Sequence, residues 1–324
     1  MSNIPLPPAS ELTVNVSAFI GPVELGVVVA IFLFGCSVVQ GYIYYSTFRR
    51  DPWFFKVLVA VVLALEAAHV SSTVACMWSM TVTTYGNPLA LAVFPVGADL
   101  AIVFTSLISW VVQGFFIYRL TKFSKTKTFP LLCVVICVLT HTTGLVVAGE
   151  AFAMTSLTLF ESAQFRLITM SLTAQAVCDL TITVGMVYHL RNRRKSGFPQ
   201  TVFAIDRLIL WTLETGLITG LTSILVTIFF LTMRRNFVWV GIYAYFACIY
   251  ANSLLASLNS RLNVLSKKSD GPFELNNRSN PSGGFSRTNP VVINISQTVE
   301  HNLNDKADAQ PEDRFVSEAG KIEV

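Results

Sequence analysis

Four acidic side chains inside apolar stretches are the residues whose chemistry most needs an explanation. Glu66, Asp99, Asp179 and Glu214 each lie within a long apolar stretch, and no Lys or Arg occurs near the middle of such a stretch. A buried carboxylate without a partner is costly, so it is expected to be protonated, hydrogen-bonded, paired with a histidine or satisfied by a cation. An ionisable group within a membrane span faces the bundle interior by default and marks a candidate functional site.

Two of these acids have other polar residues three or four positions away in the sequence. Side chains at such spacings share one face of a helix, so each acid belongs to a polar helix face. The first face carries Glu66, His69, Thr73 and Cys76. The second face carries Ser171, Gln175, Asp179 and Thr183. If both faces point inward, two acids and two histidines converge on one polar cluster, formed by Glu66, His69, His141 and Asp179. The alternative is a local hydrogen bond between helices at each residue, worth about 0.6 kcal/mol.

The segment Glu66-Ala67-Ala68-His69 also matches the Glu-x-x-His element of di-iron carboxylate bundles. Such a site needs a second copy of the element and two further Glu residues. The residues three positions before His141 and His189 are Val138 and Met186, so neither histidine completes it. We therefore predict no metal site and no cofactor.

Motifs for catalysis and for two large membrane families are missing or altered. The sequence has no Ser-His-Asp arrangement and no Gly-rich phosphate or nucleotide loop, so we predict that the chain is not an enzyme. Residues 237–259 contain no Lys to form the Schiff base of a retinal protein. The helix-end motifs of common receptors are replaced by Tyr118-Arg119-Leu120 and Tyr250-Ala251-Asn252-Ser253. The only feature that favours a receptor is therefore the predicted seven-helix topology, and this is an argument by analogy and not from a site.

The elements that must position these residues are membrane-spanning helices. Of the residues, 53% are hydrophobic and 13% are charged, about half the charged fraction of a soluble domain. Seven apolar segments are long enough to cross about 30 Å of hydrocarbon as helices. They are Ala18–Tyr45, Trp53–Val82, Val96–Leu120, Phe129–Ala151, Phe165–Leu190, Ile205–Met233 and Phe237–Asn259. The sequence thus predicts an all-α, polytopic seven-transmembrane-helix bundle in a lipid bilayer.

Basic residues indicate the orientation of these segments. They gather after the first, third, fifth and last segments, at Arg49, Arg50, Lys56, Arg119, Lys122, Lys125, Lys127, Arg191, Arg193, Arg194, Lys195, Arg207, Arg261, Lys267 and Lys268. The N-terminus and the loop at residues 85–88 have none, whereas Arg234-Arg235 is an exception on the other side. The positive-inside rule predicts an extracellular N-terminus and a cytoplasmic C-terminus, most simply in the plasma membrane. These clusters report orientation, so no nucleic-acid partner is predicted.

Composition divides the chain into three parts. Residues 1–17 form a short extracellular N-terminus and residues 18–261 the seven-helix domain. Residues 262–324 are rich in Asn, Ser, Pro, Gly, Asp and Glu, and they contain too little apolar surface to offset the entropy of folding. We predict a disordered cytoplasmic tail there. All six cysteines lie in apolar segments, which argues against a disulfide framework.

A set of short motifs is shared with a known group of proteins. The motifs are Tyr44-Tyr45, Asp51-Pro52, Lys56, Glu66 with His69, Tyr85-Gly86-Asn87-Pro88, Asp179, Arg194–Thr201, Arg207-Leu208, Thr215-Gly216, Leu221-Thr222-Ser223 and the closing run Tyr250–Arg261. In these the chain resembles basidiomycete fungal seven-transmembrane proteins with a shared C-terminal domain of unknown function. It departs from them at Val96 and Val202. The resemblance implies the fold, the membrane location and a shared domain in helices five to seven, about residues 165–261, but no activity.

Asparagines near the end of the last segment complete the polar set. Asn252 and Asn259 are one heptad apart and can hydrogen-bond neighbouring helices near the inner face. A role in packing is the leading interpretation. The candidate residues for a ligand-binding site or polar core are Glu66, His69, Asp99, His141, Gln175, Asp179, Glu214 and Asn252.

Two function classes follow from these patterns. The first is a receptor-like sensor, in which a ligand shifts the bundle and the Arg191–Arg207 linker and the tail contact a cytoplasmic signalling partner. The second is a transporter or proton-coupled channel for a small solute, in which the buried acids bind or relay ions. Against the second class, the sequence shows no inverted repeat. A membrane enzyme ranks third.

Overall fold

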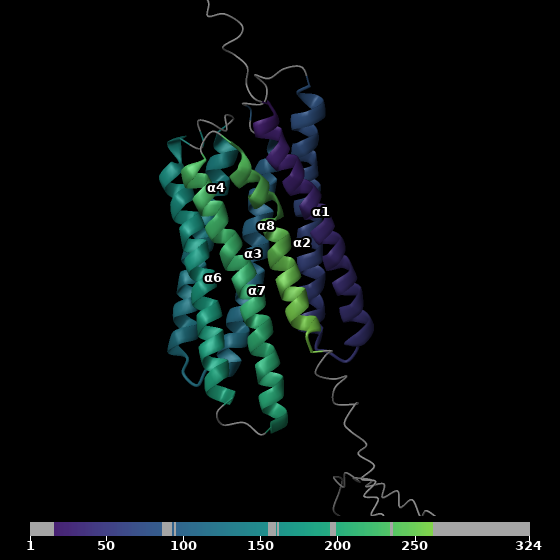
Figure 1. Ribbon diagram of the computed structural model, residues 1–324, viewed down its shortest axis with the longest axis vertical. Helices are drawn as coiled ribbons and strands as arrows, with labels where there is room; N and C mark the ends of the chain where they lie inside the picture. Colours follow the sequence, from purple (N-terminus) through teal and green to yellow (C-terminus); the bar gives the residue numbers. More distant parts are fainter. Residues whose placement is uncertain are drawn as a thin grey trace, which may run out of the picture. The chain divides into compact units, whose positions relative to one another are not determined.

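Seven long helices make up nearly all of the described part of the chain, which in this computed structural model comprises residues 16–85, 93, 95–154, 160, 162–194, 199–233 and 236–261 (Figure 1). They are α1 (Val16–Thr47), α2 (Trp53–Trp78), α3 (Val96–Phe123), α4 (Thr128–Ala153), α6 (Phe165–Arg194), α7 (Pro199–Thr232) and α8 (Val238–Asn259). Each contains an apolar stretch long enough to cross a membrane. The predicted all-α bundle of seven spans is confirmed for the described residues.

The helices extend beyond the apolar segments, because hydropathy marks where the chain enters the membrane and not where helical hydrogen bonding stops. The largest difference is at α7, which begins at Pro199 instead of Ile205. Near its start, Asp206 Oδ1 lies 2.8 Å from Nε of Arg194, the last residue of α6. At the end of α2, residues Ser79–Thr83 form a π-helical turn, η2.

The helices pack as neighbours around a shared interior. α1 contacts α2 and α8, α6 contacts α4 and α7, and α7 contacts α8. α3 contacts α2, α4, α6 and α8, and α8 contacts α1, α2, α3 and α7, so these two helices lie at the centre of the packing (Figure 1). Large apolar side chains such as Phe32, Leu132 and Leu210 are exposed on the outside of the bundle. An apolar exterior suits lipid contact, as the prediction of a bilayer partner requires.

Two glycines allow α1 and α8 to touch backbone to backbone. A Cβ atom on Gly26 would lie 2.1 Å from the carbonyl oxygen of Gly241, and one on Gly241 would lie 2.2 Å from the carbonyl oxygen of Pro22. A side chain at either position would collide with the other helix. Small residues at such crossings let membrane helices approach closely.

The same two helices are joined by amides further along. Asn252 Nδ2 donates to the Leu33 carbonyl oxygen at 2.9 Å, and its Oδ1 accepts from Gln40 Nε2 at 2.8 Å. Asn259 Nδ2 donates to the Gln40 carbonyl oxygen at 2.8 Å. The interpretation of both asparagines as packing residues agrees with these contacts.

Several sequence-based predictions concern residues outside the described ranges. These are residues 1–15 of the extracellular N-terminus, the basic exception Arg234-Arg235 and the disordered tail at residues 262–324.

Candidate functional site

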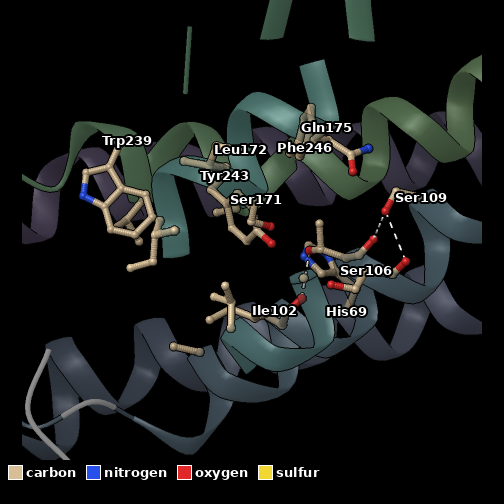
Figure 2. A pocket seen from close by; sticks show the side chains of 18 of the residues that line it. His69, Ile102, Ser106, Ser109, Ser171, Leu172, Gln175, Trp239, Tyr243 and Phe246 are labelled. Carbon is tan, nitrogen blue, oxygen red and sulfur yellow. Dashed lines mark hydrogen bonds between the residues drawn. The ribbon is translucent and has the colours of Figure 1, made fainter. Parts of the chain in front are cut away.

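A cavity lies between α1, α2, α3, α4, α6 and α8 (Figure 2). Most of its lining residues come from the first halves of α1, α3, α6 and α8 and from the second halves of α2 and α4. It therefore lies toward the end of the bundle at which α1 begins, which we call the N-terminal end. The cavity has a volume of about 110 Å³. That is room for several waters or, by comparison with known apolar cavities, for a molecule of about the size of benzene.

The walls of this cavity are mostly apolar. They are formed by Val23, Val27, Ile102, Val147, Phe160, Ile168, Leu172, Trp239, Val240, Ala244 and Phe246, among others. No Asp, Glu, Lys or Arg is among the described residues that line it. Apolar walls with a few polar groups are typical of binding sites for small molecules.

Polar side chains of the lining come from five helices. They include His69 and Thr73 on α2, Thr105, Ser106 and Ser109 on α3, Thr140 and His141 on α4, Ser171 and Gln175 on α6, and Tyr243 on α8. Figure 2 shows Trp239 at one end of the cavity, and Gln175 and Ser109 at the other end. Gln175 thus forms part of the deep end, toward the middle of the bundle.

A hydrogen-bond network centred on Asp179 lies beyond this deep end. Asp179 is buried, and its carboxylate accepts hydrogen bonds from Gln113 Nε2 at 2.7 Å, from Ser223 Oγ at 3.4 Å and from the Tyr250 hydroxyl. The Tyr250 hydroxyl also accepts from Gln175 Nε2 at 2.7 Å. Side chains of α3, α6, α7 and α8 are therefore joined at one carboxylate.

His141 connects α4 to the same network. Its Nε2 lies 3.0 Å from Gln113 Oε1, within hydrogen-bonding distance. The thiols of Cys137 and Cys178 approach the same oxygen at 3.5 and 3.3 Å. Since both His141 and Gln175 also line the cavity, its contents touch two members of the network directly.

A second, smaller cavity of about 20 Å³ lies on the other side of Asp179. Gln113, Asp179 and Tyr250 line it, together with threonines of α7 that include Thr215 and Thr219. The volume suffices for about one water. The network around Asp179 thus lines the large cavity with His141 and Gln175. It lines the small cavity with Gln113, Asp179 and Tyr250.

Glu66 is held in different surroundings. Its side chain is fully buried, and Oε1 accepts from Ser37 Oγ of α1 at 3.0 Å. The carboxyl group also interacts with the thiol of Cys248 on α8. Glu66 Oε2 has no hydrogen-bond partner among the described residues, and Glu66 does not line the large cavity.

The sequence predicted that Glu66, His69, His141 and Asp179 form one polar cluster. The structure joins two of these residues, His141 and Asp179, through Gln113. His69 lines the cavity, but neither of its ring nitrogens has a partner in the described part of the chain. Glu66 is bonded to α1 instead. The helical faces were identified correctly, but the rotation of each helix, which packing decides, separates their acids.

The remaining candidates divide between interior and exterior. Asp99 is buried at the start of α3, near the thiol of Cys76, and its Oδ1 has no partner among the described residues. Glu214 is exposed, contrary to the expectation that it faces the interior. The reason is helical periodicity, since Thr215 and Thr219 of α7 face inward and Glu214 is about 100° away from Thr215.

Sequence reasoning missed Gln113, Tyr250 and Ser37 as partners of the acids. Gln113 carried a usable signal, because an amide within an apolar span needs a hydrogen-bond partner as an acid does. Ser37 carried little signal, since serine is common at helix contacts in membranes. No group of three or more His, Cys, Asp or Glu side chains in the described ranges is arranged to hold a metal ion.

Seven helices long and apolar enough to cross a membrane indicate a multi-pass membrane protein. Within it, residues 175–263 match a family of unknown function, DUF6534. This confirms the presence of the C-terminal domain of unknown function that the resemblance implied. The match includes Gln175, Asp179, Ser223 and Tyr250, so most of the network belongs to it. No curated protein and no solved structure matched the chain.

Proposed function

We propose that this protein is a receptor-like sensor that binds a small molecule in the large cavity and reports the binding to the cytoplasm. The observation that carries the proposal is that His141 and Gln175 line the cavity and are also hydrogen-bonded into the network around Asp179. A bound molecule competes for groups that hold five helices together.

A ligand shifts a conformational equilibrium only if it binds one arrangement more tightly than another. Gln175 donates to Tyr250, which in turn donates to Asp179. A molecule that takes the Gln175 amide weakens the connection between α6 and α8. A molecule that takes His141 releases Gln113 of α3. Either change alters how α3 and α8 pack at the other end of the bundle.

Charged groups at that other end support a cytoplasmic response. Arg261 Nη2 lies 2.6 Å from Asp51 Oδ2, which joins the end of α8 to the connection between α1 and α2. Arg119 donates to Ser257 of α8, and its Nη2 has no partner among the described residues. The tail follows Arg261 directly, so movement of α8 reaches the tail. We propose that the Arg191–Arg207 linker contacts a cytoplasmic signalling partner, and the basic residues Arg191, Arg193 and Arg194 in the last turn of α6 support this.

The proposal places the protein in the plasma membrane, with the N-terminus outside and the cavity in the outer half. It is supported by the distribution of basic residues, most of which lie at the end of the bundle opposite the cavity. We also propose a fungal, basidiomycete source, for which the resemblance in the short sequence motifs is the support.

A reporter assay tests the proposal. One luciferase fragment is fused after Val324 and the other to G-protein subunits and further cytoplasmic proteins, and the cells receive a panel of small uncharged alcohols and ketones. We expect one panel member to change the signal, and Gln175→Leu to weaken that response about tenfold. Gln164→Leu is the matched control, because it removes a glutamine bonded to Glu150 and not to the network.

A transporter or proton-coupled channel is the second candidate, and the two cavities on either side of Asp179 favour it. A conduction path would pass from one cavity to the other through this network. In liposomes containing the purified chain, pH-driven flux that is lost in Asp179→Asn would support this candidate. Such flux, combined with no recruited partner, would overturn the receptor proposal.

We also propose that the protein is not an enzyme. The nearest arrangement to a catalytic pair is Cys137 with His141, which are one turn apart on α4 and interact through their side chains. Cys137 is almost completely buried and lines neither of the two cavities. A substrate in either cavity would therefore not reach its sulfur.

A further inference from the structure

We propose that the large cavity takes a small, uncharged, mostly apolar molecule that carries a hydroxyl group, and that this hydroxyl binds the imidazole of His69. This inference names the ligand class for the proposed sensor and so rests on the proposed function. The observation behind it is that His69 is completely buried, lines the cavity and lacks a hydrogen-bond partner at both ring nitrogens within the described residues (Figure 2).

Five other polar side chains around the cavity already have hydrogen-bond partners. Thr73, Thr105 and Ser109 donate to carbonyl oxygens of their own helices at 2.8 to 2.9 Å. His141 and Gln175 belong to the network around Asp179. Among the described lining residues, His69 is the one whose fully buried side-chain polar atoms have no hydrogen-bond partner.

The chemistry of the lining selects the ligand class. A charged molecule would lose its hydration without gaining a counter-ion, because no acidic or basic side chain is among the described lining residues. A purely apolar molecule would leave His69 unsatisfied, and an unsatisfied buried polar group is costly. A neutral imidazole has one donor and one acceptor nitrogen, and a hydroxyl can pair with either.

The shape of the site fits an aromatic or short branched alcohol. The volume is comparable to cavities that hold a benzene ring. Gly144 keeps room between α3, α4 and α6, since a Cβ there would lie 3.3 Å from Ser106 Oγ and 3.8 Å from Ser171 Oγ. These two hydroxyls are close enough to each other to form a second polar contact for the same molecule.

Phenol and toluene test the inference, because they differ by a hydroxyl in place of a methyl group. The full-length chain is purified into lipid nanodiscs, and the rise in melting temperature with ligand concentration gives each apparent affinity. Phenol and toluene also partition into the lipid, but to the same extent for each variant. A change in the ratio of the two affinities between variants therefore reports binding to the protein. We expect His69→Phe to lower the affinity ratio of phenol to toluene about tenfold.

Two further variants serve as controls. His189→Phe changes a histidine that packs against Phe129, away from the cavity, and it should leave the ratio unchanged. Gly144→Val should fill the space beside Ser106 and weaken both ligands.

Different failures separate the inference from the proposed function. If both ligands bind and the ratio is the same in His69→Phe, the hydroxyl inference is overturned and the sensor proposal stands. If neither ligand binds the wild-type chain, the inference is overturned as well. In this experiment the sensor proposal falls with it if, in addition, the reporter assay recruits no partner with any panel member.

A measurement on chains that keep His69 covers the case in which His69→Phe does not fold. The chain has four histidines, so ¹⁵N-histidine NMR resolves few ring signals. We expect phenol, but not toluene, to shift one signal that persists in His141→Phe, His189→Phe and His301→Phe. No such shift would overturn the inference.

Discussion

Asp179 is a buried acid whose carboxylate accepts side-chain hydrogen bonds from three other helices. Three donors from α3, α7 and α8 reach its carboxylate. At about 0.6 kcal/mol for each interhelical bond, Asp179→Ala should lower the free energy of unfolding by roughly 2 kcal/mol. The measurement is thermal unfolding of the purified chain in detergent. Glu214→Ala is the control, since Glu214 is exposed on α7 and should leave the melting temperature unchanged.

The sequence predicted the importance of this acid but not its partners. An acid within an apolar stretch is visible in any hydropathy pattern, because its burial cost does not depend on the fold. Asp179 pairs with Gln113 and Tyr250, and not with the cluster that contains Glu66, because of how each helix is rotated. Many small packing contacts decide that rotation.

The melting temperature of Asp179→Ala also has an outcome that would contradict the prediction. A value equal to that of the wild type would show that the network contributes nothing to stability.

The helices themselves were predictable because the bilayer limits the choices. A span needs about 20 apolar residues with internally satisfied hydrogen bonds, so hydropathy alone locates it. The contact of α1 with α8 was not predictable, because Gly26 and Gly241 are 215 positions apart and form no local motif. Their role depends on the crossing of two helices that are distant in the sequence.

The close crossing of α1 and α8 predicts that a side chain at Gly26 disrupts the packing of these two helices. Gly26→Val should force the two backbones apart, because a Cβ at this position lies 2.1 Å from a carbonyl oxygen. We expect a large loss of monodisperse protein in size-exclusion chromatography after detergent extraction. Gly35→Val is the matched control on α1, since no atom lies within 4 Å of a Cβ there. Equal yields of the two variants would contradict the backbone contact.

The molecule as a whole combines a cavity at one end with charged contacts at the other end. The cavity is at the N-terminal end, whereas Arg119, Arg261 and Asp51 lie at the opposite end with most of the basic residues. Asp179 lies between these two regions. If the N-terminal end is extracellular, the cavity is open to ligands from outside and the charged end is open to cytoplasmic proteins. The proposed function therefore depends on the orientation.

Cysteine labelling measures this orientation. Tyr85 lies at the N-terminal end of the bundle and is 88% exposed, and Arg50 is exposed at the opposite end. An impermeant maleimide applied to intact cells should label Tyr85→Cys, whereas Arg50→Cys should be labelled only after permeabilisation. The background is small, because five of the six native cysteines are buried and Cys36 is partly buried within α1. The reverse labelling pattern would place the cavity in the cytoplasmic half, and the positive-inside rule would then have failed for this chain. A sensor for extracellular molecules would be excluded with it, since the cavity would face the cytoplasm.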